Sequence, residues 1–179
     1  MKPLAAFFCC LVPIFLSGCA VPKLPDRSGE VLKVAQHFGF TPSLDVRVAR
    51  CVYYVADKNT WLSPNTDFLF GVCVVDAGVL YLSDLDRRTG VSTPLMKIAK
   101  LPGLTISLCN SALQKQLQVN RQEDRVALFV TQDGGFGTND SVTVEIFDAL
   151  KIAGWPVINT VRRVQLSPGH VKPPPLFAC

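Results

Sequence analysis

The sequence predicts an α+β domain built mainly of antiparallel strands, with one helix before the strands and one after them. Apolar residues recur at helical spacing near residues 28–38, alternate with polar residues over several later segments, and regain helical spacing after residue 140. Turn sequences separate the alternating segments. We therefore expect a curved antiparallel sheet or partly closed barrel that a C-terminal helix caps.

A first helix is predicted over Ser28–Phe38. Ser28 can cap its first turn, and Gly39 offers the left-handed conformation that ends many helices. His37 lies near the C-terminal end, where a cation interacts favourably with the helix dipole, so we interpret it as a surface or capping residue. The expected apolar face comprises Val31, Val34, Ala35 and Phe38.

Six or seven strands are expected in the middle of the chain. Most of these segments alternate apolar and polar residues, whereas FLFGVCVVD is apolar on both faces and predicts a covered, central strand. Asp-Ala-Gly at 76–78 and Pro-Gly at 102–103 mark tight turns, and 87–94 is expected to be a loop. The expected strands are residues 44–55, 68–76, 79–86, 95–101, 104–111, 115–122 and 125–132.

The segment after residue 140 fits two patterns. Alternation over 142–146 is typical of a strand, but the apolar residues of 142–150 also share one helical face. We predict a helix from about Ser141, because Asp140 or Ser141 can cap its start and Gly154 can end it. Residues 157–166 are a candidate last strand.

The N-terminus resembles a bacterial lipoprotein signal. Lys2 precedes the apolar run PLAAFFCCLVPIFL, which is shorter than the roughly 20 residues that a membrane span needs. The following Leu-Ser-Gly-Cys at 16–19 resembles a lipobox, which implies cleavage before Cys19 and its diacylation or triacylation, for example with palmitate. Ala20 then implies sorting to the outer membrane, facing the periplasm or the cell surface. The alternative is an ordinary secretory signal with a chance cysteine.

The expected organisation is a signal peptide (1–18), a tether (19–27), a single β-rich domain (28–163) and a proline-rich tail (164–179). The formal net charge of +4 falls to +3 without Lys2, which is too small to indicate nucleic-acid binding.

The number of cysteines is consistent with disulfide formation in an oxidising compartment. Of the seven cysteines, two leave with the signal peptide and one carries lipid, so an even number remains for disulfides. Three pairings are possible; we favour Cys51 with Cys73, because they lie in neighbouring predicted strands. A free, buried Cys73 is the alternative, and Cys179 is placed to pin the end of the chain to the domain. The four candidates are Cys51, Cys73, Cys109 and Cys179.

Catalytic chemistry is not expected. The only histidines, His37 and His170, do not look placed to act as a base on a rigid scaffold, and no G-x-S-x-G motif is present. The loop DGGFGTND (133–140) lacks the ligand spacing of an EF-hand and the lysine of a phosphate-binding loop. We therefore predict a protein that is not an enzyme and that uses no metal or cofactor.

Residues 78–156 resemble the GRAM and pleckstrin-homology-like family. The points of resemblance are the strand GVLYLSD, the strands around QLQV and VALFV, and the closing segment VEIFDALKIAGW. The resemblance implies a nearly closed barrel plugged by a C-terminal helix, and binding of lipids, peptides or proteins. Phosphoinositide binding is not implied, because the loop at 57–67 holds one lysine and two aspartates where those members carry a basic cluster.

The favoured function is a protein-binding or scaffold module, anchored to the membrane by its lipid and facing an envelope protein partner. A lipid- or glycan-binding module, with its ligand at the open end of the barrel, is the alternative. Large aromatic residues in loops and basic doublets are the candidate contacts. They are Trp61, Arg87, Arg88 and Phe136.

Overall fold

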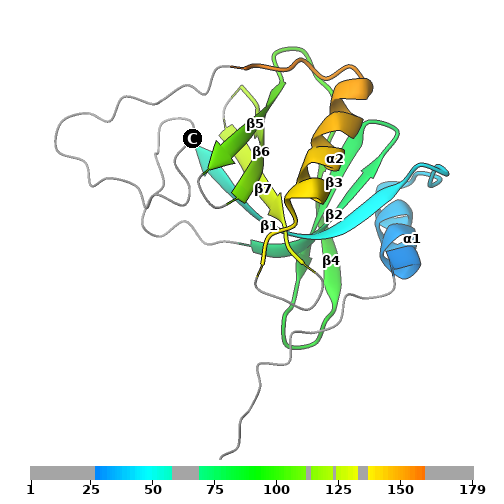
Figure 1. The fold of residues 1–179 in the computed structure, drawn as a ribbon. Coiled ribbons are helices and arrows are strands. Elements are labelled where there is room, and N and C mark those ends of the chain that lie inside the picture. Colours follow the sequence, from blue (N-terminus) through cyan, green and yellow to red (C-terminus); the bar gives the residue numbers. More distant parts are fainter. Residues whose placement is uncertain (1–26, 58–68, 112–113, 123, 133–136, 160–179) are drawn as a thin grey trace, which may run out of the picture.

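The computed structural model describes residues 27–57, 69–111, 114–122, 124–132 and 137–159. It confirms a mainly β fold in which seven antiparallel strands form one open sheet between two helices (Figure 1). The elements are α1 (Arg27–Phe38), β1 (Arg47–Asp57), β2 (Leu69–Asp76), β3 (Val79–Leu85), β4 (Ser92–Ile98), β5 (Thr105–Ser111), β6 (Gln114–Asn120), β7 (Asp124–Val130) and α2 (Asp140–Ile152).

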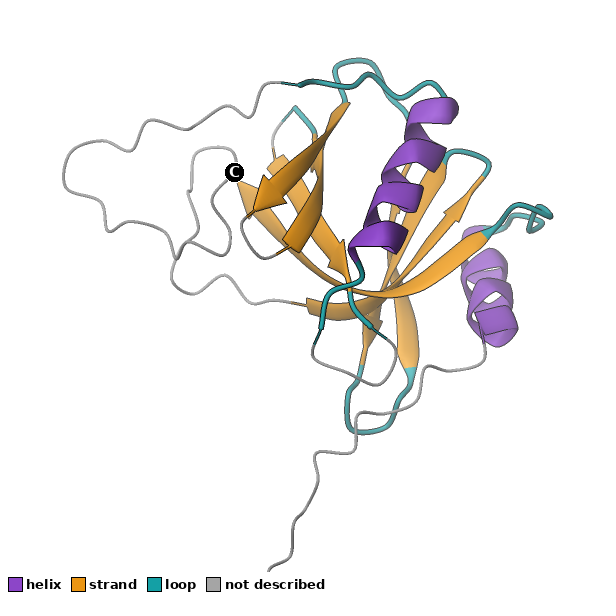
Figure 2. Ribbon diagram, viewed as in Figure 1, coloured by secondary structure: helices purple, strands orange, loops and turns teal. Residues whose placement is uncertain are grey.

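The sheet is strongly curled, and the connectivity of the chain requires it. The strand order is β4-β3-β2-β1-β7-β6-β5, so β4 and β5 lie at opposite edges although only residues 99–104 connect them. Seven strands laid flat would separate these edges by about 29 Å, whereas the connection spans at most about 25 Å. The sheet therefore wraps around α2, which lies along its concave face (Figure 2).

The concave face and α2 enclose the larger of two hydrophobic clusters. Alternate strand residues such as Tyr53 and Leu117 point inward and are fully buried. Just beyond α2, the Trp155 indole N–H donates to the Gly78 carbonyl at 2.8 Å, which ties the helix end to the β2–β3 turn. The side chains of α2 in this core are Ile146, Phe147 and Leu150.

The N-cap of α2 is Asn139, not Asp140 or Ser141 as predicted. The Asn139 side chain accepts from the Val142 N–H at 3.3 Å. The Asp140 carboxylate accepts instead from the Lys115 N–H at 3.0 Å, so it serves β6 rather than the helix. Gly154, with φ +82°, follows the helix end, and the predicted helix and its glycine stop are confirmed.

The convex face carries α1 over β1 to β4. Val31 and Val34 of α1 pack on Val72, Val74 and Tyr81 of the sheet. The Phe40 ring stacks on Tyr81 with centroids 4.5 Å apart. The predicted apolar face of the first helix is confirmed, and His37 is exposed in its last turn.

The Cys51–Cys73 disulfide is present and joins β1 to β2 across a Cα–Cα distance of 6.0 Å. This pairing was favoured because the cysteines lie in neighbouring strands, and it is confirmed. Cys109, on β5, is also disulfide-bonded, and its partner lies outside the described residues.

Several predicted boundaries are wrong by a few residues. β1 begins at Arg47 rather than at residue 44, because the Ser43 N–H donates to the Asp76 carboxylate and a turn follows. β4 begins at Ser92, inside the segment expected to be a loop, and Ser28 lies within α1 rather than before it.

Of the candidate last strand, residues 157–159 are described, and Val157 among them forms a bridge to Ile106 of β5; residues 160–166 lie outside the described residues. The signal peptide, residues 19–26 of the tether, Cys19, Cys179 and the tail from 164 lie outside the described residues.

Replacing Gly71 by alanine is expected to lower the free energy of unfolding by about 2–3 kcal/mol. A Cβ there would lie 2.1 Å from the Ser83 carbonyl oxygen and 2.6 Å from the Tyr53 ring, so the strands would have to separate. The control is Gly39→Ala, where φ is +67° but no atom lies within 4 Å. Its cost should be only about 1 kcal/mol, and equal losses in urea unfolding would contradict the packing argument.

We expect Cys109 to pair with Cys179. The other described cysteines are bonded to each other, and in a processed lipoprotein Cys19 is acylated while the two earlier cysteines are removed. Peptide mapping of the unreduced protein by mass spectrometry should recover the Cys109–Cys179 pair. A Cys109–Cys19 peptide would contradict both the pairing and the acylation of Cys19.

Candidate binding groove

The first half of β1 has a strand neighbour on one side only. Arg47–Tyr53 pair with β2, whereas pairing with β7 begins only at Cys51. The Thr131 N–H still donates to the Arg50 carbonyl at 3.0 Å, and the chain then leaves the sheet toward α2. Residues 47–50 therefore face α2 across a gap that no described strand fills.

The free edge presents backbone hydrogen-bonding groups. Because the Arg50 carbonyl points to the β7 side, strand alternation directs the N–H and C=O of Val48 to the same side. Among the described residues neither group has a backbone partner there, since β7 has ended at Val130. Such an edge is a template for another strand.

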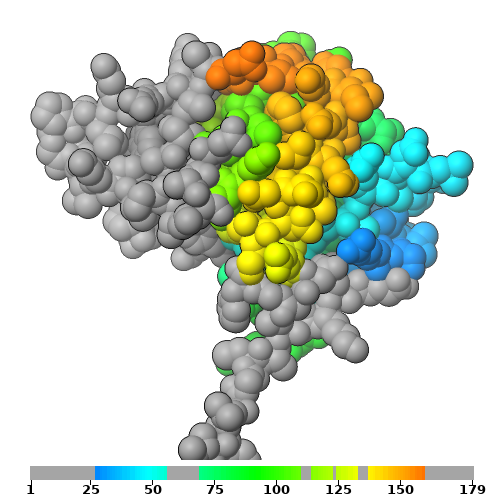
Figure 3. Space-filling view, in the orientation of Figure 1, coloured from blue at the N-terminus to red at the C-terminus, as the bar shows by residue number. Residues whose placement is uncertain are grey.

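A pocket of about 540 Å³ follows this edge. Its floor is the start of β1, one wall is the first two turns of α2, and Val130, Thr131 and Gln132 line one end. In the space-filling view, α2 and the outer part of β1 lie side by side on the facing surface (Figure 3). The lining residues are Arg27, Val46, Arg47, Val48, Ala49, Arg50, Val130, Thr131, Gln132, Asn139, Val142, Glu145 and Ile146.

The start of α2 is fixed to the end of β7, which sets the width of the groove. The Val130 N–H donates to the Thr143 hydroxyl at 3.1 Å, and the Asn139 N–H donates to the Val130 carbonyl at 2.8 Å. The Thr143 hydroxyl in turn donates to the Asn139 carbonyl at 3.1 Å. The α2 wall is therefore fixed to the end of β7 by hydrogen bonds that do not use the free edge.

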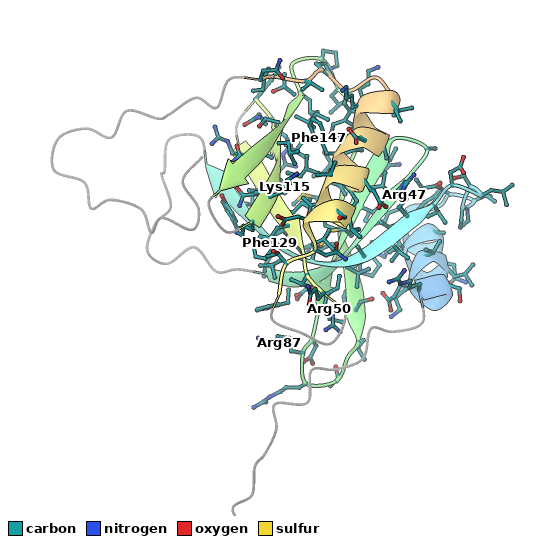
Figure 4. All side chains as sticks on the ribbon, viewed as in Figure 1. Arg47, Arg50, Arg87, Lys115, Phe129 and Phe147 are labelled. Atoms are coloured by element: carbon teal, nitrogen blue, oxygen red, sulfur yellow. A yellow bond between two sulfur atoms is a disulfide. The ribbon has the colours of Figure 1, made fainter. Side chains whose placement is uncertain are left out.

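The groove carries an excess of positive charge. Three arginines and one carboxylate, Glu145, line it. The Arg47 guanidinium lies 3.3 Å from the Glu145 carboxylate, but about half of each side chain is exposed. Arg50 is only 6% exposed. Arg47 lies on the α2 side of β1 and Arg50 on the opposite side (Figure 4), so the two charges flank the edge.

Of the four contact residues predicted from sequence, Arg87 and Arg88 do not line this pocket, and Trp61 and Phe136 lie outside the described residues. The Arg87 guanidinium lies 4.2 Å above the Phe70 ring. The Arg88 N–H donates to Asp86, which holds the pKa of that carboxyl below its usual value.

Sequence reasoning missed Arg47, Arg50 and Glu145. Arg47 and Arg50 occur inside an alternating segment, where a charged residue is normally read as the solvated face of a strand. The signal that would have found them is the length of β1, because eleven residues exceed the seven of β7 and must leave part of an edge unpaired.

A second polar group lies near the other end of β1. The Tyr53 hydroxyl is buried and has no hydrogen-bond partner among the residues that the structure describes. Burial raises the pKa of Tyr53 to about 12, and the negative charge of Asp84 acts in the same direction. This hydroxyl lies inside the curled sheet, away from the groove.

Within the ranges that the structure describes, no three potential metal ligands gather at one place, and no helix has the length and apolar character to cross a membrane. No protein-family model, curated protein or solved structure matches the chain.

Tyr53→Phe is expected to raise the free energy of unfolding at pH 7 by about 1 kcal/mol, because it removes an unpaired buried hydroxyl. The raised pKa has a second consequence: between pH 10 and 12 the hydroxyl ionises in the unfolded chain but not in the folded one, so the free energy of unfolding falls as the pH rises over this range. The free energy of unfolding of the variant, measured in urea, should therefore fall less between pH 10 and 12 than that of the parent. Tyr81→Phe is the control at pH 7, because the Tyr81 hydroxyl is not one of the buried, unpartnered groups; a destabilised Tyr53→Phe would show that the Tyr53 hydroxyl has a partner.

Proposed function

We propose that the protein is a lipid-anchored lipoprotein of the bacterial envelope whose domain is a non-catalytic protein-binding module. The lipobox-like sequence ending at Cys19 supports the anchor. The curled sheet with α2 along its concave face supports the pleckstrin-homology-like resemblance. The unpaired half of β1, opposite α2, is the observation that carries the binding function.

The two outer edges of the sheet are protected, which makes the open part of β1 distinctive. On β5, the Ile106 N–H donates to the Pro156 carbonyl at 2.8 Å, and the Ile158 N–H donates to the Ile106 carbonyl at 2.9 Å. β4 contains Pro94, an exposed Lys97 and a register shift against β3. Proline, lysine and bulges are the usual means of discouraging strand addition. The edge at residues 47–50 has neither proline nor a bulge, and its charged residues are two arginines rather than lysine.

The anchor restricts the partner to the envelope. Eight residue steps separate Cys19 from Arg27 at the start of α1, and an extended chain of that length reaches at most about 29 Å. The domain would therefore work close to the membrane surface. Trp61, Arg87, Arg88 and Phe136 stay predicted contacts for the same partner.

A lipid or glycan ligand is the second candidate function. The observation that favours it is the Tyr53 hydroxyl, a buried donor inside the curled sheet for which the described part of the chain provides no partner. A small polar ligand group reaching this point would satisfy it.

The test is site-specific photocrosslinking of the full-length, lipidated protein in its native envelope, read by mass spectrometry. A photoreactive amino acid at Glu145, in the groove, should capture one or a few proteins in stoichiometric amounts. The matched position is Ile152 on the same helix, which is 86% exposed and does not line the pocket; it should capture none of them. In Cys19→Ser cells the protein should become soluble and the capture should fall.

Three results would each contradict the proposal. Equal capture from both positions would remove the groove as the binding surface. No captured protein, together with a fixed added mass of lipid or glycan in native mass spectrometry, would favour the second candidate function. Membrane association that survives Cys19→Ser would contradict the lipid anchor.

A further inference from the structure

We infer that the groove binds an extended segment of the partner whose side chains alternate between acidic and apolar, and that this segment pairs with β1 as an added strand. The inference rests on the proposed function and names the chemistry of the partner at the same site. It follows from the backbone groups, the walls and the charges of the groove, each of which restricts the ligand independently.

The backbone groups require an extended chain. Residues 46–49 offer an edge about 14 Å long at strand spacing, up to the Arg50 carbonyl, which already accepts from the Thr131 N–H. The N–H and C=O of Val48 point into the groove and would form a pair of hydrogen bonds with one residue of the added strand. This is the main-chain recognition used in β-strand addition, where the hydrogen bonds give affinity and the side-chain pockets give specificity.

The two sides of the edge require different side chains. On the α2 side, an added strand would meet Ala49, Val142 and Ile146, which are apolar. On the opposite side it would meet Arg50 (Figure 4) and Arg27, the first residue of α1, which packs on that face. Because successive side chains of a strand point to opposite faces, the ligand is apolar toward α2 and acidic toward Arg27 and Arg50, in strict alternation. Arg47 and Glu145, on the α2 side, act on these acidic groups at longer range.

The net charge of the groove determines which charge the ligand should carry. Three arginines against one glutamate leave an excess of two positive charges. Glu145 lies beside Arg47 and reduces the attraction for an acidic segment. Removing the Glu145 charge should therefore tighten binding, while removing the Arg47 charge should weaken it. Both side chains are about half exposed, so neither change threatens the fold.

The probe is a fluorescein-labelled peptide that alternates glutamate and valine over six residues, with the lysine–valine peptide as its control. Binding to the full-length protein in detergent micelles is followed by fluorescence anisotropy at 20 mM and 150 mM salt. We expect the acidic peptide to bind at least ten-fold more tightly than the basic one at low salt, and the difference to shrink at high salt. Equal binding of both peptides overturns the charge assignment.

Two variants at Val48 distinguish the contribution of its backbone N–H to binding from that of its side chain. Val48→Pro removes the N–H on the groove side and should lower the affinity about ten-fold, whereas Val48→Ala keeps the N–H and should bind nearly as the parent does. Equal affinities overturn strand addition. If Val48→Pro does not fold, hydrogen exchange of the parent decides: the acidic peptide should slow exchange at Val48, and unchanged exchange overturns the pairing.

The two charge variants should change the affinity for the acidic peptide in opposite directions. Arg47→Gln should weaken acidic peptide binding two- to five-fold, and Glu145→Gln should strengthen it by a similar factor. A change in the same direction for both overturns the inference. If these peptide tests fail while crosslinking at Glu145 still captures a protein, the partner binds by other chemistry and the proposed function stands. If crosslinking captures nothing, the proposed function itself fails.

Discussion

The short connection between β4 and β5 is the constraint on which the rest of the structure depends. These strands are consecutive in the chain but lie at opposite edges of a seven-stranded sheet. Residues 99–104 are too few to cross a flat sheet, so the sheet must curl. The curl creates a concave face that needs filling, and α2 with Trp155 fills it. The Trp155 hydrogen bond to Gly78 then fixes the far end of the helix to the β2–β3 turn.

The free edge is a consequence of the same geometry. β1 is the central strand and is shared between two sets of neighbours: its first part pairs with β2, and its second part pairs with β7. Since the chain must leave β7 at Val130 to place α2 inside the curl, β7 cannot continue alongside residues 47–50. The groove therefore lies where the chain leaves the sheet at the end of β7 and goes on to form α2, which fills the concave face.

Most of the fold could be predicted from the sequence, because period-two and helical patterns report burial directly. Both helices, the strand segments and the Cys51–Cys73 pair were predicted from local patterns and spacing. The N-cap of α2 was not predicted correctly, because Asp140 suits that position equally well by local sequence. Only its hydrogen bond from the Lys115 N–H shows that its carboxylate has another role. The groove was missed for a similar reason. Arg47 and Arg50 have ordinary strand positions, and only the unequal lengths of β1 and β7 give them a role.

The disulfide lies where this arrangement is weakest. Cys51 is the residue at which pairing of β1 with β7 begins, so the unpaired half starts immediately before it. A strand held on one side only is prone to fray, but here a covalent bond to Cys73 of β2 fastens its inner end. Closing a loop of 22 residues also stabilises the fold by about 3 kcal/mol. The disulfide thereby fastens the inner end of the open edge to β2, and this bond depends on an oxidising compartment. A disulfide that forms in an oxidising compartment agrees with the envelope location proposed from the lipobox-like sequence before Cys19.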